Sequence, residues 1–395
     1  MARTIGTQVR GIRAPIVREG DNLVGTVVSS IMASVNNDGY QLKDKDVIGV
    51  TESLVARSQG NYVTVDEIAA DIKKKFSDTE IGVVFPILSR NRFSMILKGI
   101  ARGAKKVHLL LSYPSDEVGN HLMDIDRMDE AGLIPSQNVL TETEYRKLFG
   151  IVKHPFTGID YVQMYKDFAV NDNISVYLAN DPTVILKYTK NILVADIHTR
   201  HRTKKLLRKA GAQLVYSLDE LCTEPVSGNG YNPAYGLLGS NMAGDERLKL
   251  FPRNGQSYVD GIQKELKALT GKNVEVMIYG DGAFKDPVGK IWELADPVIS
   301  PAFTSGLAGT PNELKIKYFA DHQLKNLNGE ALAEAMKSEI RGKEGSLVGN
   351  IASQGTTPRQ LTDLLGSLCD LTSGSGDKGT PIVLIQGYFD TYATE

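Results

Sequence analysis

The feature that most constrains the fold is the order strand, helix, strand, which occurs twice between residues 81 and 216. Apolar runs and helix-capping residues predict, in chain order, a strand at 81–88, a helix from Ser89 to 101, a strand at 106–113, a strand at 191–197, a helix at 203–210 and a strand at 212–216. Strands that alternate with helices in this way form parallel sheets covered by the helices. The sequence therefore predicts an α/β fold.

The residues on either side of this region predict a second structural unit. Apolar residues recur every four positions from residue 23 to residue 35, which is typical of a helix with one buried face, and Asp21 is placed to cap it. The other predicted elements are strands at 7–12, 46–50, 274–279 and 382–385 and a helix at 257–269. Strands and helices therefore mix in this unit without the regular alternation of the central region.

The length of the chain and the order of its elements predict the domain organisation. A chain of 395 residues is too long for one ordinary hydrophobic core. We expect residues 78–228 to form an inserted α/β domain, with the Asn-Gly-Tyr-Asn-Pro run at 229–233 as its exit. Residues 1–77 and 229–395 would then form one discontinuous core domain.

Composition narrows the classes of partner. The formal net charge of −2 provides no general basic surface, so nucleic acid is a poor candidate. Cys222 and Cys369 form no CxxC pair, which argues against a disulfide framework or a zinc thiolate site. The amino terminus lacks the apolar segment of a signal peptide, and no uncharged apolar run approaches the roughly 20 residues of a membrane helix. We expect a cytoplasmic protein that acts on small molecules and has no membrane partner.

A glycine-rich segment near the carboxyl terminus is a candidate anion site. Residues 373–380 read Ser-Gly-Ser-Gly-Asp-Lys-Gly-Thr. Glycines let backbone N–H groups converge on phosphate oxygens, and Lys378 adds a positive charge. The spacing is not that of a P-loop, and the segment taken alone favours a plain surface turn over an anion site.

Asp281 is a candidate metal ligand. It follows the predicted strand at 274–279 and stands between Gly280 and Gly282, with Asp286 five residues on. A carboxylate at a strand end suits a magnesium or manganese ion that bridges phosphates. The alternative is an aspartate that only stabilises its own turn.

Other charged residues are ambiguous. Arg90 and Arg92 lie at a predicted helix start, where they favour an anion or a solvated helix end equally. His198 and His201 resemble a metal pair only superficially and read as surface residues. The motifs G-x-S-x-G and HExxH are absent, and the GxGxxG spacing of Gly374, Gly376 and Gly379 precedes a predicted strand instead of following one, so serine hydrolases, zincins and Rossmann dehydrogenases lack their signals.

Four segments, in order, resemble the coenzyme F420-0:γ-glutamyl ligase family. They are PIVREGDNL at 15–23, DVIGVTES at 46–53 with Arg57 and Gly60, LTGK at 269–272 before a strand and Asp281, and GDKGTP at 376–381 before the last strand. The resemblance covers residues 1–77 and 229–395, as in an extended variant with a large inserted domain. It implies the α+β ligase core of that family, interrupted by the α/β insert.

The resemblance implies a nucleotide-dependent amide synthesis. The acceptor carboxylate would be phosphorylated by GTP or ATP, with Mg²⁺ or Mn²⁺, and the acyl phosphate would then be attacked by the amine of L-glutamate. A carboxylate is a poor electrophile at neutral pH, so phosphoryl transfer supplies the leaving group, and cations offset the developing charge. The acceptor would resemble F420-0 or a folate, and the family also implies a homodimer.

The resemblance assigns site residues by position. Those expected at the nucleotide are Arg13, Ala14, Pro15, Ile16, Thr51, Glu52, Ser53, Arg57, Asn241, Gly376, Asp377, Lys378 and Gly379, and the one expected at the metal is Asp281. No catalytic residue is assigned.

The chain also departs from the family pattern. Leu238 stands where the first metal aspartate is expected, and the glutamate of the closing loop falls near Gly374. The sequence offers Asp245, Glu246, Asp286 and Asp377 as substitutes without choosing among them. The alternatives are therefore an inactive nucleotide-binding or sensing protein of the same fold, and an insert that has its own ligand or supplies the acceptor pocket.

Overall fold

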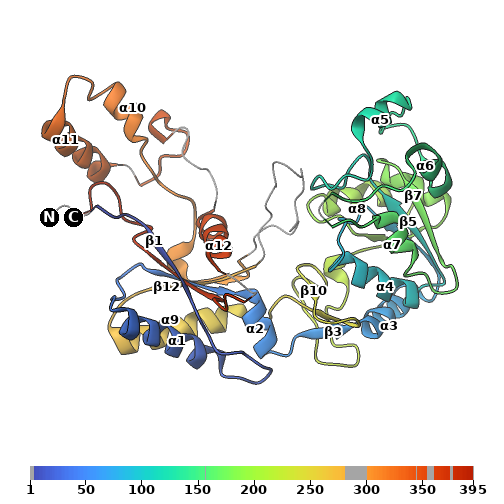
Figure 1. Cartoon of the computed structure of the whole chain (residues 1–395), viewed down its shortest axis with the longest axis horizontal. Coiled ribbons are helices and arrows are strands. Elements are labelled where there is room, and N and C mark those ends of the chain that lie inside the picture. The colour runs from blue at the N-terminus through green and yellow to red at the C-terminus, as the bar shows by residue number, and fades with distance from the viewer. Residues whose placement is uncertain are drawn as a thin grey trace.

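The computed structural model describes residues 4–155, 157–280, 300–343, 345–353, 360–373 and 377–394. The chain forms two lobes joined side by side, and the amino and carboxyl termini lie together in one of them (Figure 1). Both lobes contain strands and helices, so the predicted α/β class is confirmed. Among the described residues, no helix has the length and apolar character needed to cross a bilayer.

The first lobe is built on a five-stranded sheet in the order β1-β14-β2-β12-β13. Its strands are β1 (Gln8–Ile12), β14 (Ile382–Gln386), β2 (Val47–Thr51), β12 (Glu275–Tyr279) and β13 (Ala302–Phe303). Only β2 and β12 pair in parallel; the other pairs are antiparallel. The strands predicted at the two ends of the sequence are therefore neighbours in one sheet.

Side-chain alternation explains why helices cover both faces of this sheet. Ile48 and Val50 of β2 pack with α1 (Leu23–Asp38) and α9 (Gly255–Thr270), whereas Val47 packs with α12 (Leu361–Thr372) on the opposite face. Figure 1 shows α1 and α9 on one side of the sheet and α12 on the other. The remaining helices of this lobe are α2 (Glu52–Ser58), α10 (Ile316–Asp321) and α11 (Gly329–Gly342), with short 3₁₀ turns η3 (Ser305–Leu307) and η4 (Ile351–Ser353).

The second lobe is built on a six-stranded sheet in the order β6-β7-β5-β4-β8-β9. Its strands are β4 (Glu80–Val84), β5 (Lys106–Leu111), β7 (Ile174–Leu178), β8 (Asn191–Val194) and β9 (Leu214–Ser217), all parallel, with β6 (Leu140–Thr141) antiparallel at one edge. Its helices are α3 (Val65–Phe76), α4 (Phe93–Gly103), α5 (Ile125–Glu130), α6 (Glu142–Phe149), α7 (Tyr161–Lys166) and α8 (Arg200–Lys209), with 3₁₀ turns η1 (Pro182–Lys187) and η2 (Leu218–Glu220). The two predicted strand–helix–strand units belong to this one sheet.

A small sheet lies between the lobes. It has the order β10-β11-β3 and consists of β10 (Asn241–Met242), β11 (Arg247–Lys249) and β3 (Tyr62–Thr64). The core cluster of the second lobe extends beyond the six-stranded sheet to residues of β3, α3 and β11. The predicted domain boundaries after residues 77 and 228 stay a prediction, and the packing of α3 against α4 crosses the first of them.

Three local predictions differ from the structure. Asp21 does not cap α1; the cap is Asn22, whose side-chain oxygen accepts from Gly25 N at 3.1 Å, while Asp21 accepts from Arg18 N. The strand predicted at 81–88 ends at Val84, because Phe85 adopts a positive φ of 56°. Ser89 accepts from the N–H of Arg92 in a turn that precedes α4, so the helix begins at Phe93 rather than at Ser89.

Candidate functional site

The ends of four strands meet at one edge of the five-stranded sheet. In the pairing register, Ile12 faces Ile382, Ile382 faces Val50, and Val50 faces Ile278. One row across the sheet therefore contains the last residue of β1, the first of β14 and the penultimate residues of β2 and β12. The segments that continue from this row are 13–16, 51–53, 280 and the turn that ends at 381.

Backbone hydrogen bonds join these segments. The Ala14 N–H donates to the Gly379 carbonyl at 3.4 Å, and the Thr51 N–H donates to the Pro381 carbonyl at 3.1 Å. Gly379 has a φ of 63°, a conformation that glycine adopts without steric cost. The predicted nucleotide segments from the two ends of the chain thus contact one another.

A cleft of about 1000 Å³ opens beside this edge. Arg13, Ala14 and Pro15 line one part of it, and Lys378 and Thr380 line another. A volume of this size is in the range of sites for nucleotides and other large small molecules. Arg13 and Lys378 supply positive charge, so the cleft suits a polyphosphate.

One wall of the cleft consists of residues that were not predicted. Ser29, Ser30, Ser34, Asn37 and Asp38 of α1 line it. The Ser34 hydroxyl donates to the Asp38 carboxylate at 3.1 Å and accepts from the Tyr40 hydroxyl at 2.9 Å. The signal that could have found this wall is the polar stripe of the helix, since Ser30, Ser34 and Asp38 recur every four residues beside the apolar stripe.

Glu52 takes part in a buried ion pair. It is the first residue of α2, directly after β2, and its carboxylate pairs with the ammonium group of Lys249. The exposed fractions of the two residues are 2% and 7%. Lys249 lies opposite Asn241 in the β10–β11 ladder, so the side chains of these two residues project from the same face. The pair thus connects β11, the neighbour of the strand that contains Asn241, to the start of α2.

The other predicted nucleotide residues vary in their positions. Thr51 and Ser53 are half-buried at the start of α2, next to Glu52. Arg57 is exposed and its Nε donates to the Val17 carbonyl at 3.3 Å, which fastens α2 to the segment after Ile16. Ile16 is 83% exposed. Asp377 is exposed in the turn before Lys378.

The structure describes only some of the residues that were predicted as metal ligands or as their substitutes. Asp281, Asp286, Gly374 and Gly376 lie outside the described residues, although β12, which leads to Asp281, ends at the candidate edge. Over the described ranges, no group of three His, Cys, Asp or Glu residues is arranged to hold a metal ion. The metal site therefore stays a prediction.

One of the alternative metal ligands, Glu246, takes part in ion pairs. Its carboxylate pairs with Lys98 and, at 2.7 Å, with Arg102, and these two cations keep the pKa of Glu246 below its ordinary value. Leu238 is only 7% exposed and belongs to the hydrophobic core of the second lobe. His201 lies in the first turn of α8, whereas His198 precedes that helix.

Comparisons with known proteins add one match. The model of the family described as F420-0:gamma-glutamyl ligase matches residues 11–387, a span that includes both lobes. The comparison with curated proteins finds no match.

Proposed function

Because this chain belongs to the F420-0:γ-glutamyl ligase family, we propose that it joins L-glutamate to a small carboxylate acceptor and consumes GTP or ATP. The family is one of ligases, and the observation that carries the finer proposal is the shared sheet edge. Residues from β1, β2 and β14, which are far apart in the sequence, contact one another there beside a cleft of about 1000 Å³.

The reaction would proceed in two steps, phosphoryl transfer and amide formation. An oxygen of the acceptor carboxylate attacks the γ-phosphorus, the bond to the β-phosphate bridging oxygen breaks, and an acyl phosphate and a nucleoside diphosphate form. The glutamate amine then attacks the acyl carbon, an amide bond forms, and phosphate leaves as the amine loses a proton. Arg13 and Lys378 would bind the phosphates, and the backbone of the 377–379 turn would orient them.

Divalent cations would neutralise the phosphate charge, and Asp281 is the residue proposed to hold one of them. The acceptor would be an F420-0-like or folate-like carboxylate. We also propose a cytoplasmic location and a homodimer on the basis of the family. Light scattering of the purified protein tests the homodimer directly, and a monomeric mass would contradict it.

The central test is a coupled assay. The protein is incubated with GTP or ATP, Mg²⁺ or Mn²⁺, L-glutamate and a panel of deazaflavin and pterin carboxylates. We expect phosphate release in proportion to a new amide, detected by mass spectrometry. Phosphate release that needs no acceptor, or no release with any acceptor while nucleotide binds, would count against the ligase.

One observation favours a second candidate function. Leu238 stands where the family pattern has a metal aspartate, and it is buried in an apolar core. A protein that binds nucleotide without turnover would tolerate this change. Saturable thermal stabilisation by GTP, without amide formation under any of the conditions above, would support this sensing role over the ligase.

A further inference from the structure

The six-stranded sheet contains a point at which its strand order reverses. From β4 the chain proceeds outward through β5 and β7 in one direction, and β8 and β9 extend the sheet in the other. The loops that follow β4 and β8 therefore run to opposite sides. In open parallel sheets, such a reversal leaves a crevice at the carboxyl ends of the two strands, and ligands bind there.

A pocket lies at this reversal. Ile87 and Leu88 follow β4, Ala195 and Ile197 follow β8, and Leu218 follows β9, and all of them line it. Its cavity volume is about 40 Å³. The pocket belongs to the second lobe and is separate from the cleft at the five-stranded sheet.

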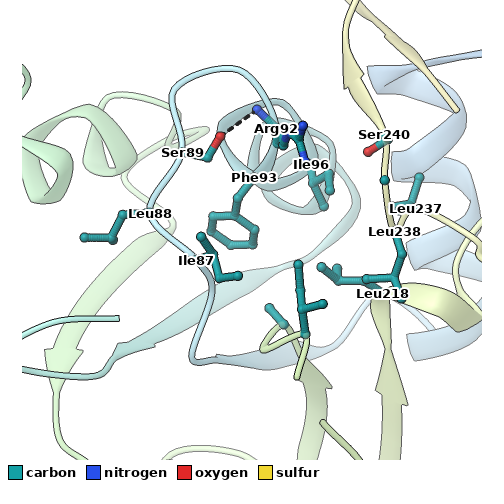
Figure 2. A pocket seen from close by; sticks show the side chains of 13 residues that line it. Ile87, Leu88, Ser89, Arg92, Phe93, Ile96, Leu218, Leu237, Leu238 and Ser240 are labelled. Carbon is teal, nitrogen blue, oxygen red and sulfur yellow. Dashed lines mark hydrogen bonds between the residues drawn. The ribbon is translucent and has the colours of Figure 1, made fainter. Parts of the chain in front are cut away.

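The pocket is polar at one end and apolar at the other. Figure 2 shows Ser89, Arg92 and Ser240 at one end, with Ile87 and Leu238 toward the other. The Ser89 hydroxyl accepts from the Arg92 N–H at 3.0 Å, which holds the start of α4 against the pocket. A ligand that fits this arrangement has an apolar body and one polar group.

Ser240 is a buried hydroxyl that points into the pocket. It is 1% exposed, and its Oγ has no hydrogen-bond partner within the part of the chain that the structure describes. Figure 2 shows the hydroxyl directed across the pocket toward Arg92 and Ile96. Because a buried hydroxyl without a partner is costly, a bound ligand atom that accepts or donates a hydrogen bond there would remove the cost.

Arg92 and the start of α4 bring positive charge to the polar end. The helix α4 has 11 residues, begins after Arg92 and has no acidic residue in its first turn, so its dipole adds to the arginine charge. Asp196, between the lining residues Ala195 and Ile197, accepts from Thr199 and Thr203, and Glu117 accepts from the N–H of Ile197.

We propose that this pocket binds a small carboxylic acid with a short hydrocarbon body. The carboxylate would contact Arg92 and Ser240, and the hydrocarbon would lie against Ile87 and Leu238. A cavity of about 40 Å³ accommodates roughly three water-sized groups, at about 10–15 Å³ each, which limits the acid to about the size of acetate. The apolar wall favours such an acid over inorganic phosphate. The site does not depend on the proposed ligase reaction.

Calorimetric titration of the full chain with acetate, acetamide and inorganic phosphate tests the site. We expect acetate to bind with a roughly millimolar or lower Kd, and acetamide and phosphate to bind at least about tenfold more weakly. Arg92→Met should weaken acetate binding by about tenfold or more, and Ser240→Ala by about threefold to tenfold. Arg90→Met is the matched control, because Arg90 is exposed and does not line the pocket; it should leave the affinity unchanged.

A third variant, Leu238→Trp, fills the apolar end and should abolish binding. Thermal unfolding of every variant verifies that it is folded. Absence of acetate binding to the unmodified protein would overturn the proposal, and so would affinities that Arg92→Met and Ser240→Ala leave unchanged. GTP titration of the same samples separates the two sites: if GTP binds and acetate does not, only the pocket proposal fails.

Discussion

At the scale of single residues, the buried pair of Glu52 and Lys249 gives the sharpest prediction. Removing one member of a buried ion pair leaves a charge in a poorly solvated environment, so Lys249→Met should lower the free energy of unfolding by about 3–5 kcal/mol. The double variant Glu52→Gln/Lys249→Met should lose less than the sum of the single variants. Urea unfolding of the two single variants and the double variant measures these losses of free energy.

Lys98→Met is the matched control for this pair. Its partner Glu246 is half-exposed, so the change should cost about 0–1 kcal/mol. A loss of the same small size for Lys249→Met would show that the Glu52 pair contributes no more than a surface pair.

A second prediction at this scale concerns the cation in the carboxyl-terminal turn. Lys378 is exposed and lines the cleft, so Lys378→Met should leave stability unchanged and weaken nucleotide binding by about tenfold. Lys209→Met, an equally exposed lysine at the end of α8, should change neither quantity. Titration with GTP measures the affinity of each variant. Equal affinities for Lys378→Met and Lys209→Met would show that Lys378 does not bind the phosphates.

At the scale of elements, the contact of α3 with α4 depends on small residues. A Cβ atom added at Gly99 would lie 2.6 Å from Cγ2 of Ile68 and 3.1 Å from the Val65 carbonyl oxygen. Gly99→Ala should therefore separate the two helices and destabilise the protein by about 1–3 kcal/mol. Gly342→Ala, at the end of α11, meets no atom within 4 Å and should be neutral or stabilise by about 0.5–1 kcal/mol. Thermal unfolding that ranks the two variants the other way would refute this packing account.

At the scale of the whole molecule, we expect residues 62–250 to fold as a unit. One apolar cluster includes Val63, Ile68 and Leu248 together with the strands of the six-stranded sheet, and Tyr62 pairs with Lys249, so the ends of the fragment are adjacent. A fragment limited to residues 78–228 lacks α3 and should expose the apolar face of α4. Circular dichroism melts compare the two fragments. If the fragment 78–228 unfolds cooperatively and the fragment 62–250 does not, the result would instead support the domain boundaries predicted from the sequence.

The sequence by itself determined most of the elements. Four-residue periodicity predicted α1, and apolar runs predicted β2, β12 and β14, because these signals depend on neighbouring residues. Motif resemblance predicted the family, which the match over residues 11–387 confirms. The predictions for the cap of α1 and the start of α4 were wrong because the side chains of Asp21 and Ser89 accept hydrogen bonds in turns that precede these helices, from the N–H groups of Arg18 and Arg92.

Only the tertiary structure decided which of these elements meet. Local patterns carry no information about strand neighbours, and Glu52 and Lys249 are 197 positions apart in the sequence. The row of strand ends, the polar wall of α1 and the pocket between β4 and β8 all arise from such long-range pairing. The sequence supplied residues suited to binding phosphate, and hydrophobic packing on both sheet faces brought the two ends of the chain together around one cleft.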